Sequence, residues 1–314
     1  MTISHINLME LSMFKFKPVP PAIGALIAMA TALTAVMAAE ASGQETLQVE
    51  RAGTAGTRTV ILVPGLATPG AVWDGTVAQF ESAADMHVVT LAGFGGVAPA
   101  ARSAGVIETA VNDLAALIDR EELTDAVIVG HSMGGQIALQ LAAARPGAVT
   151  DVVVVDSAPF FARLFNPAIT AEQAAAFGQA TAAQMAAMDR DTYLAQSRMG
   201  LPIQSITAEG QAQVMAWVEA SDPATVATAF GEVAGSDFSP VLADVAADVT
   251  VLVAWAPGAP VGAEALAGVY ASQYAGLESV EVDVIEGSRH FIMLDQPDAF
   301  AERLAAVIGN GEGE

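Results

Sequence analysis

The chain has 314 residues, of which 53% are hydrophobic and 15% are charged, and this composition excludes an intrinsically disordered chain. The formal net charge of −23 gives an acidic surface that repels nucleic acid and anionic lipid heads, so neither is expected as a partner. The chain contains no cysteine, which excludes disulfides, thiolate nucleophiles and cysteine-based zinc sites.

The amino terminus has the layout of a secretory signal. Lys15 and Lys17 precede an uncharged stretch from residue 18 to 39, and an Ala-x-Ala sequence ends at Ala41. This order predicts a leader of residues 1–41 that is cleaved, followed by a periplasmic or secreted protein with no stable membrane partner. The alternative is an uncleaved membrane anchor, because the uncharged stretch is long enough to cross a bilayer.

From about Val60 onward, short apolar runs alternate with longer stretches of helical spacing. We expect strands at residues 59–65, 86–91, 125–130 and 149–156, separated by helices at 71–84, 106–123 and 134–146. Strands that alternate with helices of this length predict a parallel sheet covered by helices on both faces, which is an α/β fold in a domain of residues 42–314.

The alternation breaks between about residues 159 and 239, a stretch that is helical in pattern and rich in alanine, methionine and glutamine. Strands at 249–255 and 279–287 and helices at 262–276 and 298–309 then resume it. An all-helical insert before the last strands predicts a cap over the carboxyl ends of the strands, where open α/β sheets bind ligands. Phe160 and Phe161 are predicted to shape the substrate pocket, and packing inside the cap is the alternative.

A nucleophile motif follows the strand at 125–130. The sequence Gly130-His131-Ser132-Met133-Gly134 fits G-x-S-x-G between a strand and a helix, which is the setting that supports this motif. The sharp turn raises the Ser132 hydroxyl above the sheet edge. It also directs the Met133 N–H, at a helix N-terminus, toward an oxyanion formed there.

With these residues, the chain resembles the α/β-hydrolase family from about residue 60 to 308. The segments that carry the resemblance are LVPGLATPGAVWD (62–74), GHSMGG (130–135) and IEGSRHFIMLDQPDAF (285–300). The resemblance implies a mostly parallel twisted sheet and a triad in the order Ser, acid, His. It also implies that the Leu66 backbone N–H is the second oxyanion donor, although Pro64 departs from the His-Gly that many members have there.

Of the four histidines, His290 is predicted to be the catalytic base, because it stands in the loop where the family places that residue. Arg289 departs from the glycine that many members have at the preceding position. His131 is expected to pack beside its strand and to point away from Ser132. His87 begins a strand on the far side of the pattern, and His5 lies in the leader.

The triad acid is not at the position that many family members use, four residues beyond the tryptophan of the strand at 249–255. Counting from Trp255, that position is Ala259. A minority of the family keep the acid at the end of the preceding strand, where this chain has Asp156. Asp156 is therefore predicted to orient the histidine, and a cap of the next turn with Ser157 is its alternative role.

Two further possibilities for the acid stay open. Glu264 could swing toward His290, or the enzyme could run as a Ser–His dyad. Asp295 is expected to anchor the loop of His290 and not to serve as the acid.

A serine nucleophile predicts acyl transfer to water through an acyl-enzyme. Together with the apolar cap, it predicts a small to medium hydrophobic ester or lactone as the small-molecule substrate. C–C hydrolase, peptidase and cofactor-free haloperoxidase activities are alternatives, as is a non-catalytic binding protein of the same fold. The sequence shows no metal-ligand spacing, no G-x-G-x-x-G and no P-loop, so no metal or cofactor is implied.

Overall fold

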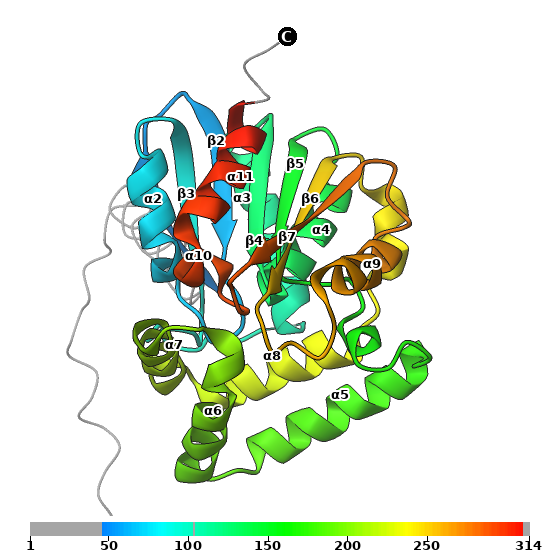
Figure 1. Cartoon of the computed structure of the whole chain (residues 1–314). Helices are drawn as coiled ribbons and strands as arrows, with labels where there is room; N and C mark the ends of the chain where they lie inside the picture. Colours follow the sequence, from blue (N-terminus) through cyan, green and yellow to red (C-terminus); the bar gives the residue numbers. More distant parts are fainter. Residues whose placement is uncertain (1–45, 103, 310–314) are drawn as a thin grey trace, which may run out of the picture. The chain divides into compact units, whose positions relative to one another are not determined.

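The computed structural model describes residues 46–102 and 104–309, and the predicted leader lies outside them. Within the described residues, seven strands form one sheet in the order β1-β3-β2-β4-β5-β6-β7 (Figure 1). The strands are β1 (Leu47–Gly53), β2 (Arg58–Val63), β3 (Ala84–Leu91), β4 (Ala126–His131), β5 (Val149–Val155), β6 (Asp248–Trp255) and β7 (Val280–Glu286). All neighbours pair in parallel except β1, which is antiparallel to β3.

The predicted strands and main helices of the α/β pattern are confirmed, and two short elements are additional. The helices of the sheet layers are η1 (Gly70–Trp73), α2 (Asp74–Phe80), α3 (Val106–Glu121), α4 (Met133–Ala144), α9 (Ala263–Gln273), α10 (Ile292–Asp295) and α11 (Pro297–Gly309). The sequence pattern did not indicate β1 or α10. β1 is a half-exposed edge strand, so its apolar alternation is weak.

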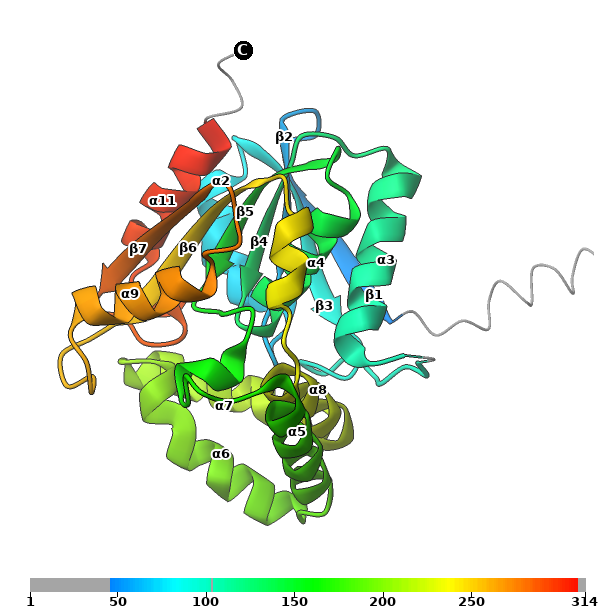
Figure 2. The same ribbon diagram turned by 90° about the vertical axis from the view of Figure 1, so that its right-hand side faces the viewer.

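Both faces of the sheet are covered, as the apolar strands require. Alternate residues along β4 and β5 enter two different cores: Ile128 and Val152 face α3, α4 and α9, whereas Val127 and Val153 face α2 and α11 (Figure 2). Every residue of β4 is buried. The carboxyl end of this central strand is therefore a rigid platform for the residue that follows it, Ser132.

The predicted cap is a set of helices at the carboxyl ends of the strands (Figures 1 and 2). It contains η2 (Phe161–Leu164), α5 (Ala171–Ala186), α6 (Arg190–Gln204), α7 (Ala208–Ala220), α8 (Pro223–Gly235) and η3 (Ser239–Asp244). The four α-helices each begin at an Asp or Thr whose side chain accepts a hydrogen bond from a backbone N–H of the first turn. The start of each of these four helices is therefore set by its own capping residue.

Helices α5 and α8 approach closely because glycines line their contact. A Cβ on Gly178 would lie 2.3 Å from the carbonyl oxygen of Gly231 and 2.6 Å from the Cα of Gly235. Any larger residue at position 178 would push the two helices apart. No helix within the described ranges is both long enough and apolar enough to cross a membrane.

Candidate active site

Ser132 lies at a strained turn between β4 and α4, as its motif predicts. Its backbone angles are φ 54° and ψ −120°, a region that L-residues rarely adopt and that stores strain. Its N–H donates to the carbonyl oxygen of Val155 at 2.9 Å, so the bonding between β4 and β5 continues into the turn. This bond holds Ser132 at the edge of the sheet, where it lines a cavity.

The two glycines of the motif are required by close backbone contacts. A Cβ on Gly130 would lie 2.2 Å from the carbonyl oxygen of Gly134, and a Cβ on Gly134 would lie 2.3 Å from that of Val63. Both distances are far below a van der Waals contact. The turn therefore forms only when both positions lack a side chain.

Asp156 follows β5 directly and extends the hydrogen-bonding ladder with its side chain. Its backbone N–H donates to Leu252 O of β6 at 2.8 Å. The Ala254 N–H, two residues further along β6, donates to the Asp156 Oδ1 at 3.1 Å. The carboxylate thus replaces a backbone carbonyl at the point where the chain leaves the sheet, with Asp156 at φ 45°, which aspartate tolerates better than most residues.

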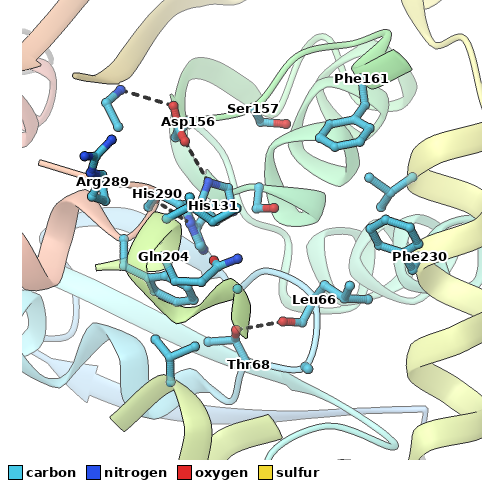
Figure 3. Close-up of a pocket in the computed structure, with 18 of the residues that line it drawn as sticks. Leu66, Thr68, His131, Asp156, Ser157, Phe161, Gln204, Phe230, Arg289 and His290 are labelled. Carbon is cyan, nitrogen blue, oxygen red and sulfur yellow. Dashed lines mark hydrogen bonds and ion pairs between the residues drawn. The ribbon is translucent and has the colours of Figure 1, made fainter. Parts of the chain in front are cut away.

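The other carboxylate oxygen of Asp156 meets His290. The distance from His290 Nδ1 to Asp156 Oδ2 is 2.6 Å (Figure 3), which is a short, charge-assisted hydrogen bond. β4 and β5 are adjacent in the sheet, so Ser132 and Asp156 lie one strand apart, and His290 lies beyond β7 on the same edge. The structure brings Ser132, His290 and Asp156 to one cavity.

The alternative acid, Glu264, is not part of this arrangement. It lies exposed in the first turn of α9 and is not among the residues that line the cavity. Ala259, at the position where many family members keep the acid, does line the cavity. The geometry therefore selects Asp156 as the carboxylate that contacts the imidazole.

Tyr270 of α9 is a contact of the acid that the sequence reasoning missed. Its hydroxyl donates to Asp156 Oδ1 at 3.2 Å, and its side chain is buried. Burial and the nearby Asp156 carboxylate raise the pKa of Tyr270 well above its usual value, so the hydroxyl stays a donor. One helical turn later, the buried Tyr274 donates to Ser157 O at 2.8 Å. No short sequence motif indicates either contact.

Asp295 anchors the His290 loop, as predicted. Its Oδ2 accepts the Arg289 backbone N–H at 2.8 Å, and its Oδ1 accepts the Ser205 hydroxyl at 2.6 Å. Ser205 is the residue directly after α6. The Phe291 N–H also donates to the carbonyl oxygen of Gln204 at 2.9 Å. The loop of the base is therefore bonded to the cap as well as to the sheet domain.

His131 is buried beside the strand and packs against the loop of the base. Its ring lies 4.6 Å from that of His290 and 4.6 Å from that of Phe291, measured between centroids. Its Nε2 lies 3.0 Å from the carbonyl oxygen of His290. Burial, and then the nearby His290, lower the pKa of His131 well below its usual value. A neutral ring with its proton on Nε2 fits this hydrogen bond.

The predicted oxyanion donors are the backbone N–H groups of Leu66 and Met133. Met133 is the first residue of α4, and Leu66 lies in the loop after β2 and lines the cavity. Among the described residues, neither backbone N–H has a protein acceptor. Unpaired amides at a helix N-terminus and in the neighbouring loop suit a negative charge that develops between them.

The cavity lies between the sheet edge and the cap and has a volume of about 600 Å³, within the range of small-molecule sites. The lining residues with apolar side chains are Leu66, Ala67, Phe161, Leu164, Phe165, Met185, Leu201, Ile203, Val214, Val218, Val226, Phe230, Val233, Ala254, Trp255, Ala256, Ala259 and Phe291. Four aromatic residues of the insert, Phe161, Phe165, Tyr193 and Phe230, and one methionine, Met185, therefore face the cavity. Figure 3 shows Phe161 and Phe230 on one side of this space, with His290 across from them.

The prediction that Phe160 lines the pocket is wrong. Its side chain is fully buried and packs with Ala162 and Ala174 in a separate small core, and it is not among the residues that line the cavity. The guanidinium of Arg163 covers its ring at 4.6 Å. The chain enters the turn of η2 at this point, so the adjacent Phe161 points in another direction, into the cavity.

A comparison with protein families agrees with this architecture. The model of a family described as "Alpha/beta hydrolase family" matches residues 60–303, which is most of the chain. The chain belongs to the alpha/beta hydrolase family. Its serine turn, its parallel sheet and the order of Ser132, Asp156 and His290 along the chain are those of a family member.

Curated relatives match over a limited segment. Lipase LipV of Mycobacterium tuberculosis is 36% identical over 112 residues, which are 36% of this chain and 42% of that protein. A pimeloyl-[acyl-carrier protein] methyl ester esterase of Klebsiella pneumoniae is 33% identical over 121 residues, 38% of this chain and 45% of that protein. The matches thus span less than half the length of these relatives.

Solved structures share the fold over nearly the whole described chain. An enol-lactonase from Burkholderia xenovorans is 17% identical with a TM-score of 0.65, and the match covers 84% of this chain and 96% of that one. A thermophilic esterase from Thermogutta terrifontis is 18% identical with a TM-score of 0.69, covering 86% and 97%. A bromoperoxidase from Bacillus anthracis, 16% identical with a TM-score of 0.69, covers 84% and 95%. These likenesses establish the fold.

Proposed function

We propose that the protein is a serine hydrolase that cleaves a small to medium hydrophobic carboxylic ester or lactone through an acyl-enzyme. The observation that carries this proposal is the 2.6 Å bond between Asp156 and His290 in the same cavity as Ser132 on its strained turn. An imidazole held through Nδ1 by a carboxylate presents its Nε2 as a base. The lipase and esterase names of the curated relatives support the same reaction class.

Each residue of the site has its own role in the reaction. His290 takes the proton of Ser132 as the serine oxygen attacks the carbonyl carbon, and the Leu66 and Met133 amides bind the oxygen that becomes negative. His290 then gives that proton to the departing alcohol. Water, activated by the same imidazole, releases the acyl group and regenerates the serine. Asp156 keeps the imidazole in its orientation and stabilises its charged form.

A fluorophosphonate probe tests the nucleophile directly. We expect covalent labelling of Ser132 in the purified protein and none in Ser132→Ala, with intact mass as the readout. A panel of esters, lactones and amides then defines the bond that is cleaved. A protein that neither reacts with the probe nor hydrolyses any member of the panel would be a binding protein with a hydrolase fold.

We further propose that the protein is exported and loses residues 1–41. The proposal is supported by the order of positive, apolar and small residues in that segment. Mass spectrometry of protein from a cell fractionation checks it: mature protein should begin near Ser42 and be soluble in the periplasm or medium. Protein recovered from the membrane fraction with residues 14–39 still attached would contradict cleavage.

A further inference from the structure

Arg289 is distinguished from the other arginines of the chain by what its guanidinium contacts. Among the described residues, which include all arginines of the sequence, the Arg289 guanidinium makes no hydrogen bond, ion pair or contact with an aromatic ring. Six others form ion pairs with carboxylates: Arg51, Arg58, Arg120, Arg145, Arg198 and Arg303. Two more donate to backbone carbonyls, and Arg163 covers the Phe160 ring.

This contrast matters because carboxylates are plentiful in the chain. Aspartate and glutamate number 35, against 12 lysines and arginines. Asp295 contacts this residue, but its carboxylate accepts the backbone N–H of Arg289. The five donors of the guanidinium are thus not used by any of the described residues.

The half-buried Arg289 side chain lines the cavity of Ser132. It is the one lysine or arginine among the lining residues, and Asp156 is the one carboxylate. Asp156 is occupied by His290, Ala254 and Tyr270. Among the described residues that line it, the cavity therefore offers a substrate one permanently charged side chain without a protein partner, that of Arg289.

The position of Arg289 relative to the base indicates which part of a substrate it would meet. Figure 3 shows Arg289 on one side of His290 and the apolar residues Phe161 and Phe230 on the other. The imidazole gives its proton to the leaving alcohol, so the alcohol portion lies on the His290 side and the acyl chain lies in the apolar part.

We propose that Arg289 forms an anion subsite that binds a carboxylate or phosphate on the alcohol portion of the ester, opposite an apolar acyl chain. This inference rests on the proposed ester hydrolysis and names the substrate class. A guanidinium matches the two oxygens of such a group with parallel N–H donors.

Matched substrates test the subsite. The three compounds are 3-(butanoyloxy)propanoate, its neutral amide 3-(butanoyloxy)propanamide, and 3-(butanoyloxy)propyl phosphate. The readout is kcat/KM for each, with p-nitrophenyl butanoate as a report of hydrolysis itself. A charge-assisted hydrogen bond corresponds to a preference of about 10- to 100-fold for an anionic ester over the neutral one. A preference for one anion over the other identifies the group.

Two variants assign the preference to the residue. In Arg289→Gln the ratio of anionic to neutral kcat/KM should fall toward one, mostly through a higher KM for the anionic ester. Arg289→Lys keeps the charge but loses the planar fork of donors, so its ratio should lie between those of the wild type and Arg289→Gln. The control is Arg198→Gln, which removes the same charge from an exposed ion pair on α6 that does not line the cavity. Its ratio and its activity should equal those of the wild type.

The possible failures are separable. A wild-type enzyme that cleaves the neutral ester and p-nitrophenyl butanoate with no preference for either anion would overturn the subsite and leave the esterase proposal standing. A preference that survives in Arg289→Gln would also overturn it. Failure to cleave any of the four esters or any lactone of the panel, together with no labelling of Ser132 by the fluorophosphonate probe, would refute the proposed function itself.

Discussion

Asp156 and His290 are 134 positions apart in the chain, yet their side chains share a hydrogen bond of 2.6 Å. Parallel strands make this possible, because β5 and β7 both end at the edge of the sheet that carries Ser132. The acid is thus one strand from the nucleophile, at the end of β5 and not in the loop after β6. A carboxylate at the end of either β5 or β6 could contact His290, because both strands end at the same cavity.

Asp156→Asn should abolish most of the activity without unfolding the protein. Asparagine keeps the volume but presents a neutral group that favours the wrong imidazole tautomer and does not stabilise the imidazolium. In a comparable triad this change costs about 10⁴ in kcat, or roughly 5 kcal/mol of transition-state stabilisation. The measurement is kcat on one activated ester, with the melting temperature alongside.

Glu264→Gln is the matched control, because Glu264 is exposed and lies outside the cavity. It should leave kcat unchanged. A wild-type rate in Asp156→Asn together with a lost rate in Glu264→Gln would identify Glu264, in the first turn of α9, as the acid. Unchanged rates in both would indicate a Ser–His dyad.

Tyr270→Phe should lower kcat about tenfold, since it removes one of the hydrogen bonds that hold the acid, and a bond to a charged group is worth about 1.5–3 kcal/mol. Tyr274→Phe removes an equivalent buried hydroxyl from the residue that caps the end of α9, but that hydroxyl donates to a backbone carbonyl. Both variants should lose stability in urea unfolding, whereas Tyr270→Phe alone should lose rate. Equal rates in the two variants would reduce Tyr270 to a structural residue.

The parts of the site that sit within one short segment were predictable from the sequence. The turn of Ser132 follows from two glycines between a strand and a helix, and Asp156 follows from its place at a strand end. His290 was predicted from its place in the loop after the last strand, where the family resemblance puts the base. Only the Ser132 turn is indicated by its neighbours alone; Asp156 and His290 also needed the positions that the family resemblance implies.

The parts that depend on contacts across the fold were not predictable. Tyr270 reaches Asp156 from 114 positions away, and its own segment reads only as an apolar helix. Phe160 and Phe161 are adjacent and identical, so only the direction of the η2 turn separates a core residue from a pocket residue. The edge strand β1 was missed because it is half exposed and pairs with a strand beginning more than thirty positions later.

The two phenylalanines provide a direct test of that difference. Phe161→Ala should alter the preference among acyl chain lengths more than the rate on a short acetate ester, because its ring lines the cavity. Phe160→Ala should instead destabilise the fold by about 3–5 kcal/mol, the cost of an emptied core site. The measurements are kcat/KM for a series of chain lengths and the free energy of unfolding. An equal loss on all chain lengths in Phe161→Ala would point to a folding role for that residue.

Stability should fall between pH 7.5 and pH 5.5, and His131 should account for part of the loss. Burial holds its pKa in the folded protein well below the usual value, while in the unfolded chain it titrates near about 6.5. Below that pH the unfolded state binds a proton that the folded state does not, so the free energy of unfolding decreases as pH falls. One such histidine contributes about 1.4 kcal/mol over this range when it stays neutral in the fold. Burial also lowers the pKa of His87, which lowers the stability in the same direction as pH falls.

Urea unfolding at pH 7.5 and pH 5.5 measures the loss of stability that His131 causes. His131→Gln has no titrating ring, so the difference in unfolding free energy between the two pH values should be smaller by about 1.4 kcal/mol. If the pH dependence of His131→Gln equals that of the wild type, His131 titrates in the folded protein as it does in the unfolded chain, and burial does not lower its pKa.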